Sequence, residues 1–365
     1  MRKIARTSLL CAGTAMGAGL ASGRELLSYF SVFSGTFAWV ILAFMFLYAG
    51  IMYALMRSAK KLQAYTPMDL TAAAMGKYNK IFWFLPALSY LIVFAAMLAG
   101  ADALQRVAMP GLKMPWLAAA MALGCAAAEK KGIDAVISIN TVTALFATVA
   151  MLALSVSALI APEGTFWTLM QQSRTEPASA AHYYRLGLYL CMNTFLAAGV
   201  VAPAAKSLSN KDMLLSSLGA AVMLGLVMLI SGFALMQSDA VISRAQMPMM
   251  YIAVRLGYAA FAGFSIMMAV SVFTAMASSF YPLAGAMSRL TKSRFKATMS
   301  ALAMGIILSR LGFTGAINAL YPVMGVVSAV FIIMLIKNAE KSKGAGRALP
   351  AFRSAYVCRF SKRIR

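Results

Sequence analysis

The chain has 365 residues, of which 62% are hydrophobic and only 12% are charged, and its mean hydropathy is +0.79. Soluble domains carry about 25% charged residues, so this composition excludes a soluble globular protein and predicts an all-α integral membrane protein in the cell membrane. The formal net charge of +23 would point to nucleic acid in a soluble chain, but most of the cations here flank apolar stretches, so we expect no nucleic-acid partner.

Ten apolar stretches are candidate membrane-spanning helices. They cover residues 7–30, 34–57, 81–104, 114–128, 133–161, 183–206, 213–236, 256–287, 296–312 and 315–337. Because they leave no room for a soluble domain, we expect one ten-span transmembrane domain over 1–337 and a basic, disordered cytoplasmic tail over 338–365. The tail holds eight Lys and Arg residues, which also suit contact with anionic lipid at about 1 kcal/mol per cation near the surface.

The cations are divided unequally between the two sides of the membrane. With the N-terminus in the cytoplasm, 25 of the 33 Lys and Arg residues fall in the N-terminal arm, the loops after even-numbered spans and the tail. Only 7 fall in the loops after odd-numbered spans, and Arg24 lies inside the first span. Cytoplasmic loops carry such an excess of cations, so we expect both termini in the cytoplasm.

The first span is polar at its centre, where an ordinary span is apolar. It contains three glycines, a serine and two charged residues there: Gly17, Gly19, Gly23, Ser22, Arg24 and Glu25. A helix over 7–30 would be about 36 Å long against a hydrocarbon core of about 30 Å, which puts Gly19 near the midplane. Breaks at that depth survive only where they face protein, water or a ligand, and discontinuous helices are typical of secondary transporters. We therefore predict an interrupted first helix that holds a ligand.

Other interpretations of the same residues stay open. The glycines fit a small-xxx-small packing pattern, although packing does not explain charges that cost about 2.5–3.5 kcal/mol each at a helix centre. Ser22 to Glu25 also matches a capping box, which would begin a half-helix whose free amide groups point to the centre of the protein. Glu25 is therefore a cap or an ion-pair partner of Arg24, which we favour, or a proton or cation site, or a direct substrate contact.

The sixth span, 183–206, is polar at its centre as well. Asn193 and Thr194 lie near the midplane, and Gly199 loosens the following turn. Pro203 removes an amide donor and disfavours a helical residue before it. We therefore predict that the sixth helix is interrupted and that Asn193, Thr194 and Gly199 contact the substrate.

The two irregular spans occupy corresponding places in the two halves of the chain. Many transporters contain two repeats of opposite orientation and bind substrate where their interrupted helices meet. We therefore predict five-plus-five inverted repeats over about 7–161 and 183–337. Tyr90 in the third span is a further buried polar candidate for the substrate site, although an interhelical hydrogen bond is its favoured role.

The eighth span carries a hydroxyl cluster formed by Thr274, Ser278 and Ser279. Such hydroxyl groups often only join helices. Hydroxyl and carbonyl oxygens are also suitable ligands for a hard monovalent cation, and this cluster faces the first span if the two pack together. We therefore consider a sodium site between this cluster and the carbonyl groups around Gly17 and Ala18.

The first-span motif Gly17-x-Gly19-Leu20-Ala21-Ser22-Gly23-Arg24-Glu25 resembles that of the YkvI-like bacterial membrane proteins, in the amino acid, polyamine and organocation transporter superfamily. The resemblance covers about residues 5–337 and is specific in the first span. It implies the LeuT-type inverted-repeat fold, with substrate between spans one and six and any sodium ion between spans one and eight. Carried onto this chain, these regions are Gly17 to Ser22, which includes Ala21, then Asn193 to Gly199, and Thr274 to Ser279.

A secondary transporter is the function that these observations favour. We expect it to move a small amino acid or amine-like solute by alternating access, coupled to sodium or to protons as a symporter, and to be a monomer or homodimer without a cofactor. A ligand sensor that retains a transporter fold is the alternative. An enzyme is not expected, since His182 is the only histidine and no nucleophile elbow or phosphate-binding motif accompanies it.

Overall fold

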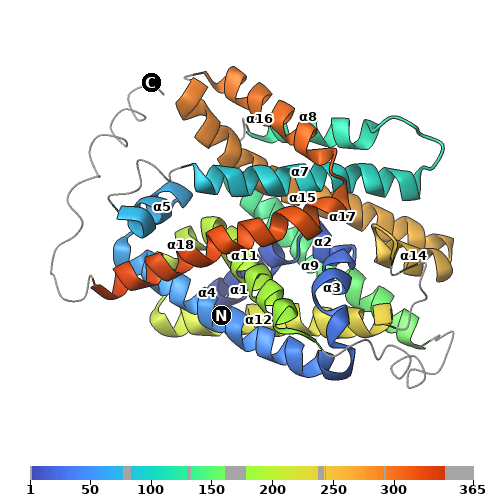
Figure 1. Cartoon of the computed structure of the whole chain (residues 1–365), viewed down its shortest axis with the longest axis horizontal. Helices are drawn as coiled ribbons and strands as arrows, with labels where there is room; N and C mark the ends of the chain where they lie inside the picture. The colour runs from blue at the N-terminus through green and yellow to red at the C-terminus, as the bar shows by residue number, and fades with distance from the viewer. Residues whose placement is uncertain are drawn as a thin grey trace.

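The computed structural model describes residues 2–76, 84–129, 133–160, 178–236, 242, 244–291 and 293–341. Throughout this part of the chain the secondary structure is helical, which confirms the all-α fold class (Figure 1).

Two breaks divide the first predicted span into three helices: α1 (Arg2–Ala15), α2 (Ala18–Ala21) and α3 (Arg24–Tyr29). The other predicted spans lie on α4 (Phe37–Leu62), α7 (Leu85–Ala108), α8 (Trp116–Glu129), α9 (Ile133–Ile160), α11 (Ala180–Ala205), α12 (Asn210–Met236), α15 (Tyr258–Thr291), α16 (Arg294–Ser309) and the run α17 (Phe313–Gly315), η3 (Ala316–Leu320) and α18 (Tyr321–Lys341). The connections contain η1 (Ser31–Thr36), α5 (Pro67–Met75) and α14 (Pro248–Arg255).

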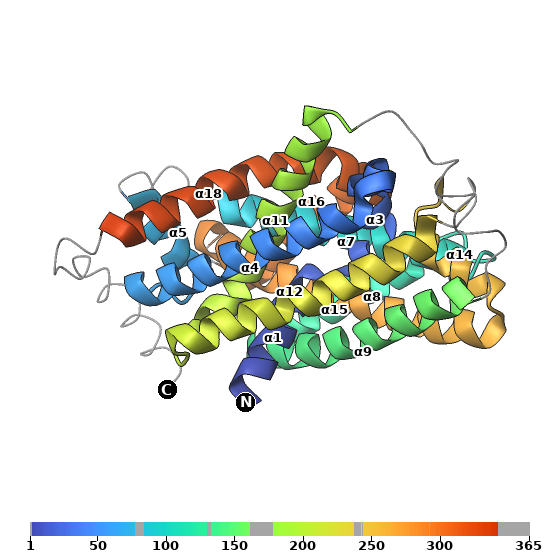
Figure 2. The same cartoon turned by 90° about the horizontal axis from the view of Figure 1, so that it is seen from below.

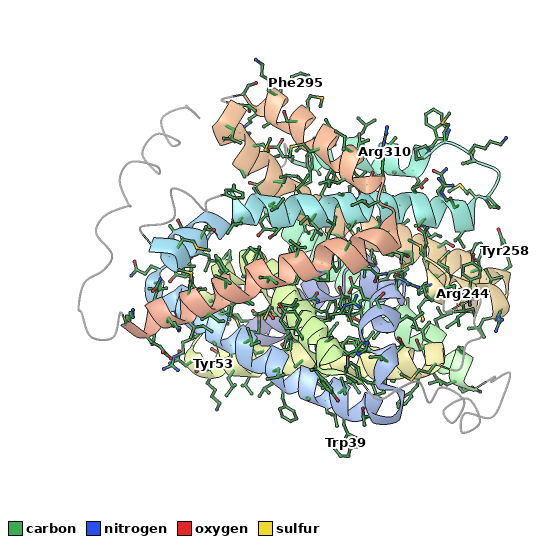
Figure 3. The ribbon with its side chains drawn as sticks, in the orientation of Figure 1. Trp39, Tyr53, Arg244, Tyr258, Phe295 and Arg310 are labelled. Carbon is green, nitrogen blue, oxygen red and sulfur yellow. The ribbon has the colours of Figure 1, made fainter. Side chains whose placement is uncertain are left out.

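Five helical runs within the described residues are long and apolar enough to cross a membrane by themselves: Phe37–Leu62, Leu85–Ala108, Asn210–Met236, Tyr258–Ser288 and Phe313–Lys341. The outer faces of the bundle carry large apolar side chains. Trp39 is 74% exposed and Phe295 is 72% exposed, and both project away from the bundle (Figure 3). Exposed apolar surface on this scale is unfavourable in water but suits lipid, so the chain is a multi-pass membrane protein.

The long helices run between two ends of the bundle, one marked by α5 and the other by α14 (Figures 1 and 2). At the α5 end, the Asn338 amide near the end of α18 donates to the carbonyl oxygens of Ala73 and Ala74 in α5, both at 2.9 Å. Lys60 at the end of α4 donates to the carbonyl of Leu208, just before α12. The second and tenth predicted spans therefore end where the seventh begins, as the predicted alternation of directions requires.

The opposite end joins the first span to the sixth span and to α14. The rings of Phe33 in η1 and Tyr183 in α11 lie 4.9 Å apart. The Met249 amide of α14 donates to the Ser22 carbonyl at 2.9 Å. The described contacts are thus consistent with spans that cross alternately, while the five-plus-five repeat and the side that faces the cytoplasm stay predictions.

The predicted interruption of the sixth helix is wrong for this conformation. α11 is one helix from Ala180 to Ala205 and includes Pro203. The Asn193 amide donates to the Tyr189 carbonyl at 3.0 Å and the Thr194 hydroxyl to the Leu190 carbonyl at 2.8 Å. The polar groups of these side chains are hydrogen-bonded to the preceding turn, and the helix stays intact. Pro203 lies near the end of the helix, where it removes only one backbone hydrogen bond.

Candidate functional site

The first span breaks at Met16 and Gly17, which confirms the predicted interruption. α1 ends at Ala15 and α2 begins at Ala18, with Gly17 as the N-cap residue at φ −53° and ψ 171°. The last carbonyl groups of α1 and the first amide groups of α2 therefore have no partner in their own helix. A break of this kind near mid-membrane presents both carbonyl and amide groups to whatever occupies the gap.

Gly17 borders open space, although most of the surrounding segment is buried. A methyl group added at its Cα would meet no other atom within 4 Å, and Gly17 is half-buried between the buried residues Met16 and Ala18. Thr14, one turn earlier, is also half-buried, and its hydroxyl bonds to carbonyl groups of its own helix at 2.9 and 3.1 Å. Thr14 was missed from the sequence because a threonine within an apolar helix resembles ordinary packing.

A second irregularity follows at Ser22 and Gly23, where the predicted free amide groups are not free. The Ser22 amide donates to the Ala18 carbonyl at 2.8 Å, and the Gly23 amide donates to the Leu20 carbonyl at 2.9 Å. Gly23 has a φ of +81°, a conformation that glycine adopts at no steric cost. The Ser22 and Gly23 amide groups are therefore already paired, and the start of α2 is the earlier place in this span where amide groups begin a helix.

Helix α14 covers this second irregularity. Besides the hydrogen bond from Met249 to Ser22, the Arg24 guanidinium donates to the Ala245 carbonyl at 3.3 Å. A methyl group built on Gly23 would approach Leu235 and Met249 to 2.8 and 2.9 Å. The end of the bundle marked by α14 is thus tightly closed over the turn between α2 and α3.

The capping box predicted for Ser22 and Glu25 does not form. Gly23 is the N-cap residue of α3, and the Ser22 hydroxyl donates to the Gly19 carbonyl at 2.8 Å while it accepts from the Arg24 amide at 3.3 Å. The Arg24 side chain donates to Ala245 before α14, whereas the Glu25 carboxyl group accepts from Tyr189, and the predicted ion pair between Arg24 and Glu25 does not form. Gly23 occupies the N-cap position because the backbone turns there with a positive φ, which glycine adopts at no steric cost.

Glu25 lies in a buried aromatic cluster between the first and sixth spans. Its side chain is only 4% exposed, and one carboxyl oxygen, Oε2, accepts a hydrogen bond from the Tyr189 hydroxyl of α11 at 2.6 Å. The Tyr189 ring stacks on Tyr29 with ring centroids 4.4 Å apart. The other oxygen, Oε1, lies against Gly19, because a methyl group built there would come within 1.9 Å of it. Gly19 therefore makes room for the Glu25 carboxyl group.

The hydroxyl cluster of the eighth span lies on a helix that packs against α2. Thr274 and Ser279 are buried and donate to carbonyl groups of their own helix at 2.9–3.1 Å. A hydroxyl group that donates still has lone pairs for a cation. Pro282 has no amide hydrogen for the carbonyl four residues earlier, that of Ser278. The predicted sodium site keeps suitable oxygen ligands here, although the Ala18 carbonyl already accepts from Ser22.

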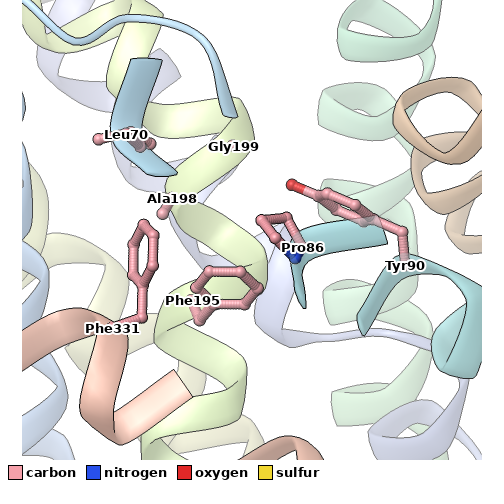
Figure 4. A pocket seen from close by; sticks show the side chains of 7 residues that line it. All are labelled: Leu70, Pro86, Tyr90, Phe195, Ala198, Gly199 and Phe331. Carbon is pink, nitrogen blue, oxygen red and sulfur yellow. The ribbon is translucent and has the colours of Figure 1, made fainter. Parts of the chain in front are cut away.

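Tyr90 and Gly199, both predicted for the substrate site, meet at a separate cavity nearer the α5 end (Figure 4). The cavity has a volume of about 10 Å³ and is also lined by Leu70, Pro86, Phe195, Ala198 and Phe331. That volume is close to what one water molecule requires. The Phe195 and Phe331 rings meet edge to face beside this cavity, with ring centroids 4.8 Å apart. Asn193 and Thr194 are buried elsewhere on the same helix.

Comparisons with known proteins show the fold and leave the family open. No family model and no curated protein matches the chain. Among solved structures, the nucleobase-cation-symport-1 family transporter Mhp1, in a closed conformation with bromovinylhydantoin bound, is 13% identical with a TM-score of 0.55, over 90% of this chain and 77% of that one. The manganese transporter of Eremococcus coleocola, in complex with an aromatic bis-isothiourea substituted compound, is 13% identical with a TM-score of 0.57, over 93% of this chain and 85% of that one. A mutant of that transporter gives a TM-score of 0.56 with the same identity and coverage.

These neighbours are transporters of the LeuT-type fold, which is the fold that the first-span motif implies. At 13% identity the likeness establishes the fold alone. Membership in the YkvI-like family stays a prediction. The chain is therefore a multi-pass, all-helical membrane protein that shares the fold of the LeuT-type transporters.

Proposed function

We propose that this protein is a secondary active transporter that moves a small organic solute, an amino acid or an amine-like compound, by alternating access. The observation that carries the proposal is the break at Gly17, where one helix ends, another begins, and the backbone borders open space. The shared fold with transporters supports it, and the motif at 17–25 supports placing the chain among the YkvI-like proteins.

The chemistry of the break fits a zwitterionic or cationic solute. The amide groups at the start of α2 suit an anionic group such as a carboxylate as hydrogen-bond donors. The carbonyl groups at the end of α1 suit an ammonium group or a sodium ion. Thr14 adds a hydroxyl group at the same place. Solute binding there would act on the sixth span as well, because α1 packs against α11.

Alternating access requires that the two ends of the bundle open in turn. At one end, α14 closes over Ser22 and Gly23, and at the other, Phe195 and Phe331 close the small cavity beside α5. We infer that spans one, two, six and seven rock against the other spans. This motion would open the α14 end of the bundle while the α5 end stays closed, and then the reverse. We infer that the conformation described here, with α14 packed over Ser22 and Gly23, is a state between the two openings.

The first experiment is thermal unfolding of the purified protein with amino acids, amines and small organic acids, with and without sodium, because a ligand stabilises by RT ln(1 + [L]/Kd). The solutes that stabilise are then tested for accumulation in liposomes. Accumulation inside the liposomes supports transport, whereas a ligand that stabilises the protein and never accumulates supports the sensor alternative.

The site is tested by filling the open space at Gly17. We expect Gly17→Val to abolish solute stabilisation and uptake while the protein still folds, because the side chain enters empty space. Gly50→Val is the matched control, since Gly50 also has no atom within 4 Å of an added methyl group but lies on an exposed face of α4. Unchanged uptake by Gly17→Val would show that the solute binds elsewhere.

A further inference from the structure

The Glu25 carboxyl group is buried inside the helix bundle, and no cation among the described residues pairs with it. Within the part of the chain that the structure describes, its only hydrogen-bond partner is the Tyr189 hydroxyl at 2.6 Å, and no Lys, Arg or His nitrogen lies within 4.0 Å of it. An ionised carboxylate taken out of water costs several kcal/mol unless a partner compensates it. The closed conformation is therefore suited to a neutral Glu25.

The groups around Glu25 are mostly uncharged, and the one cation named among them, Arg185, makes no ion pair with it within 4.0 Å. From α11 come Tyr189 and, farther out, Arg185, whose guanidinium carbon lies 6.0 Å from the centre of the Tyr29 ring. Tyr29 comes from α3, and its hydroxyl donates to the Ile317 carbonyl in the π-helical turn η3 at 2.9 Å. Tyr321, at the start of α18, is also buried. Arg24, the nearest cation in sequence, points to Ala245 instead.

The same carboxyl group joins the two spans that the transport cycle has to separate. Glu25 belongs to α3 of the first span, whereas Tyr189 belongs to α11 of the sixth span. Its other oxygen rests on Gly19 in α2, directly beside the break at Gly17. A change in the charge of Glu25 would therefore act both on the contact between the spans and on the break itself.

We infer that Glu25 is the proton-binding group through which this transporter is coupled to the proton gradient. This inference rests on the proposed function and names its coupling ion. A proton from water on the open outer side neutralises the carboxylate, which allows the carboxyl group to enter the aromatic cluster and the spans to close. When the first and sixth spans part toward the other side, water reaches Glu25 and takes the same proton. One proton then moves with each turnover, and no bond other than O–H forms or breaks.

The test measures protons and solute together in liposomes that contain the pH dye pyranine. An equimolar mixture of the standard amino acids, radiolabelled, is added outside at equal pH, and both acidification of the interior and solute uptake are recorded. We expect the wild-type protein to acidify the interior as solute enters. In Glu25→Gln we expect the number of protons moved per solute molecule to fall to background, because the amide binds no proton. This expectation holds at any rate of solute exchange that the variant retains.

A carboxyl group outside the cluster supplies the control. Asp102→Asn removes a carboxyl group of α7 whose 3.0 Å ion pair with Arg106 is largely exposed, so we expect it to leave the protons per solute unchanged. Tyr189→Phe covers the case in which Glu25→Gln fails to fold. Because the lost hydrogen bond favours the carboxylate, we expect this variant to shift the pH of half-maximal uptake upward and to keep proton movement.

Each result decides between the two proposals. Solute uptake by the wild-type protein without acidification overturns proton coupling and leaves transport standing. Full acidification by Glu25→Gln overturns the role of Glu25, as does a pH profile that Tyr189→Phe does not move. If the wild-type protein shows neither uptake nor acidification, both the proposed amino acid transport and its coupling are overturned.

Discussion

The first and sixth spans differ in the continuity of their backbones, since the first is interrupted and the sixth is one helix. Both carry polar residues and glycine near their centres, and the sixth also carries a proline. In the first span the chain leaves the helix twice, at Gly17 and at Gly23. In the sixth span, Asn193 and Thr194 bond to the preceding turn and α11 continues to Ala205.

The difference lies in the backbone and in the neighbouring segments. Gly23 takes a left-handed conformation that other residues adopt only at a cost of about 1–2 kcal/mol, and α14 supplies a donor for the carbonyl group that the turn exposes. α11 contains no residue with positive φ, and its polar side chains find carbonyl groups within the helix. Polar residues in a span therefore mark a break only where a backbone conformation and an external partner support it.

The strongest way to test this contrast is to remove the left-handed glycine. We expect Gly23→Ala to destabilise the protein by about 2–4 kcal/mol, from about 1–2 kcal/mol of backbone strain and about 1–2 kcal/mol of overpacking against Leu235 and Met249. Thermal unfolding in detergent checks this. A melting temperature within a degree of the wild type would show that the turn between α2 and α3 is not held in this conformation.

The two glycines of the break are expected to respond differently to the same small change. Gly19→Ala places a methyl group on the Glu25 carboxyl group, so we expect a loss of about 1–3 kcal/mol together with impaired proton coupling. Gly17→Ala meets no atom, and we expect its stability to stay within about 0.5 kcal/mol of the wild type. Equal melting temperatures for the two variants would contradict the placement of Glu25 against Gly19.

Much of the fold could be predicted from hydropathy, because the requirement for long apolar helices in lipid is independent of tertiary detail. Within the described residues, the predicted spans fall mostly on helices, and the break in the first span follows from its glycines and charges. The partners of Glu25 could not be predicted. A capping box is a local pattern, whereas the hydrogen bond to Tyr189 joins residues 164 positions apart in the chain.

The candidate site shows the same limit. Gly17 and Gly19 differ by two positions in sequence, and nothing in their local pattern tells that one faces open space and the other a carboxyl group. Tyr90 and Gly199 were expected beside the first-span residues, and they meet instead at a separate cavity. Which polar residues share a site depends on how the helices are rotated about their axes, which a single sequence leaves undetermined.

The smallest expected effect concerns the continuous sixth helix. In Pro203→Ala the new amide hydrogen can donate to the Gly199 carbonyl, a hydrogen bond worth about 0.5–1.5 kcal/mol, while the unfolded chain regains freedom worth about 0.4–1 kcal/mol. These terms nearly cancel, so we expect the melting temperature to change by no more than a few degrees. We expect uptake to slow, because Gly199 lines the cavity where the α5 end would open and a fully bonded turn resists bending. If Pro203→Ala transports as fast as the wild type, α11 moves as a rigid rod through the cycle, and the only helix of this pair that must bend is the first.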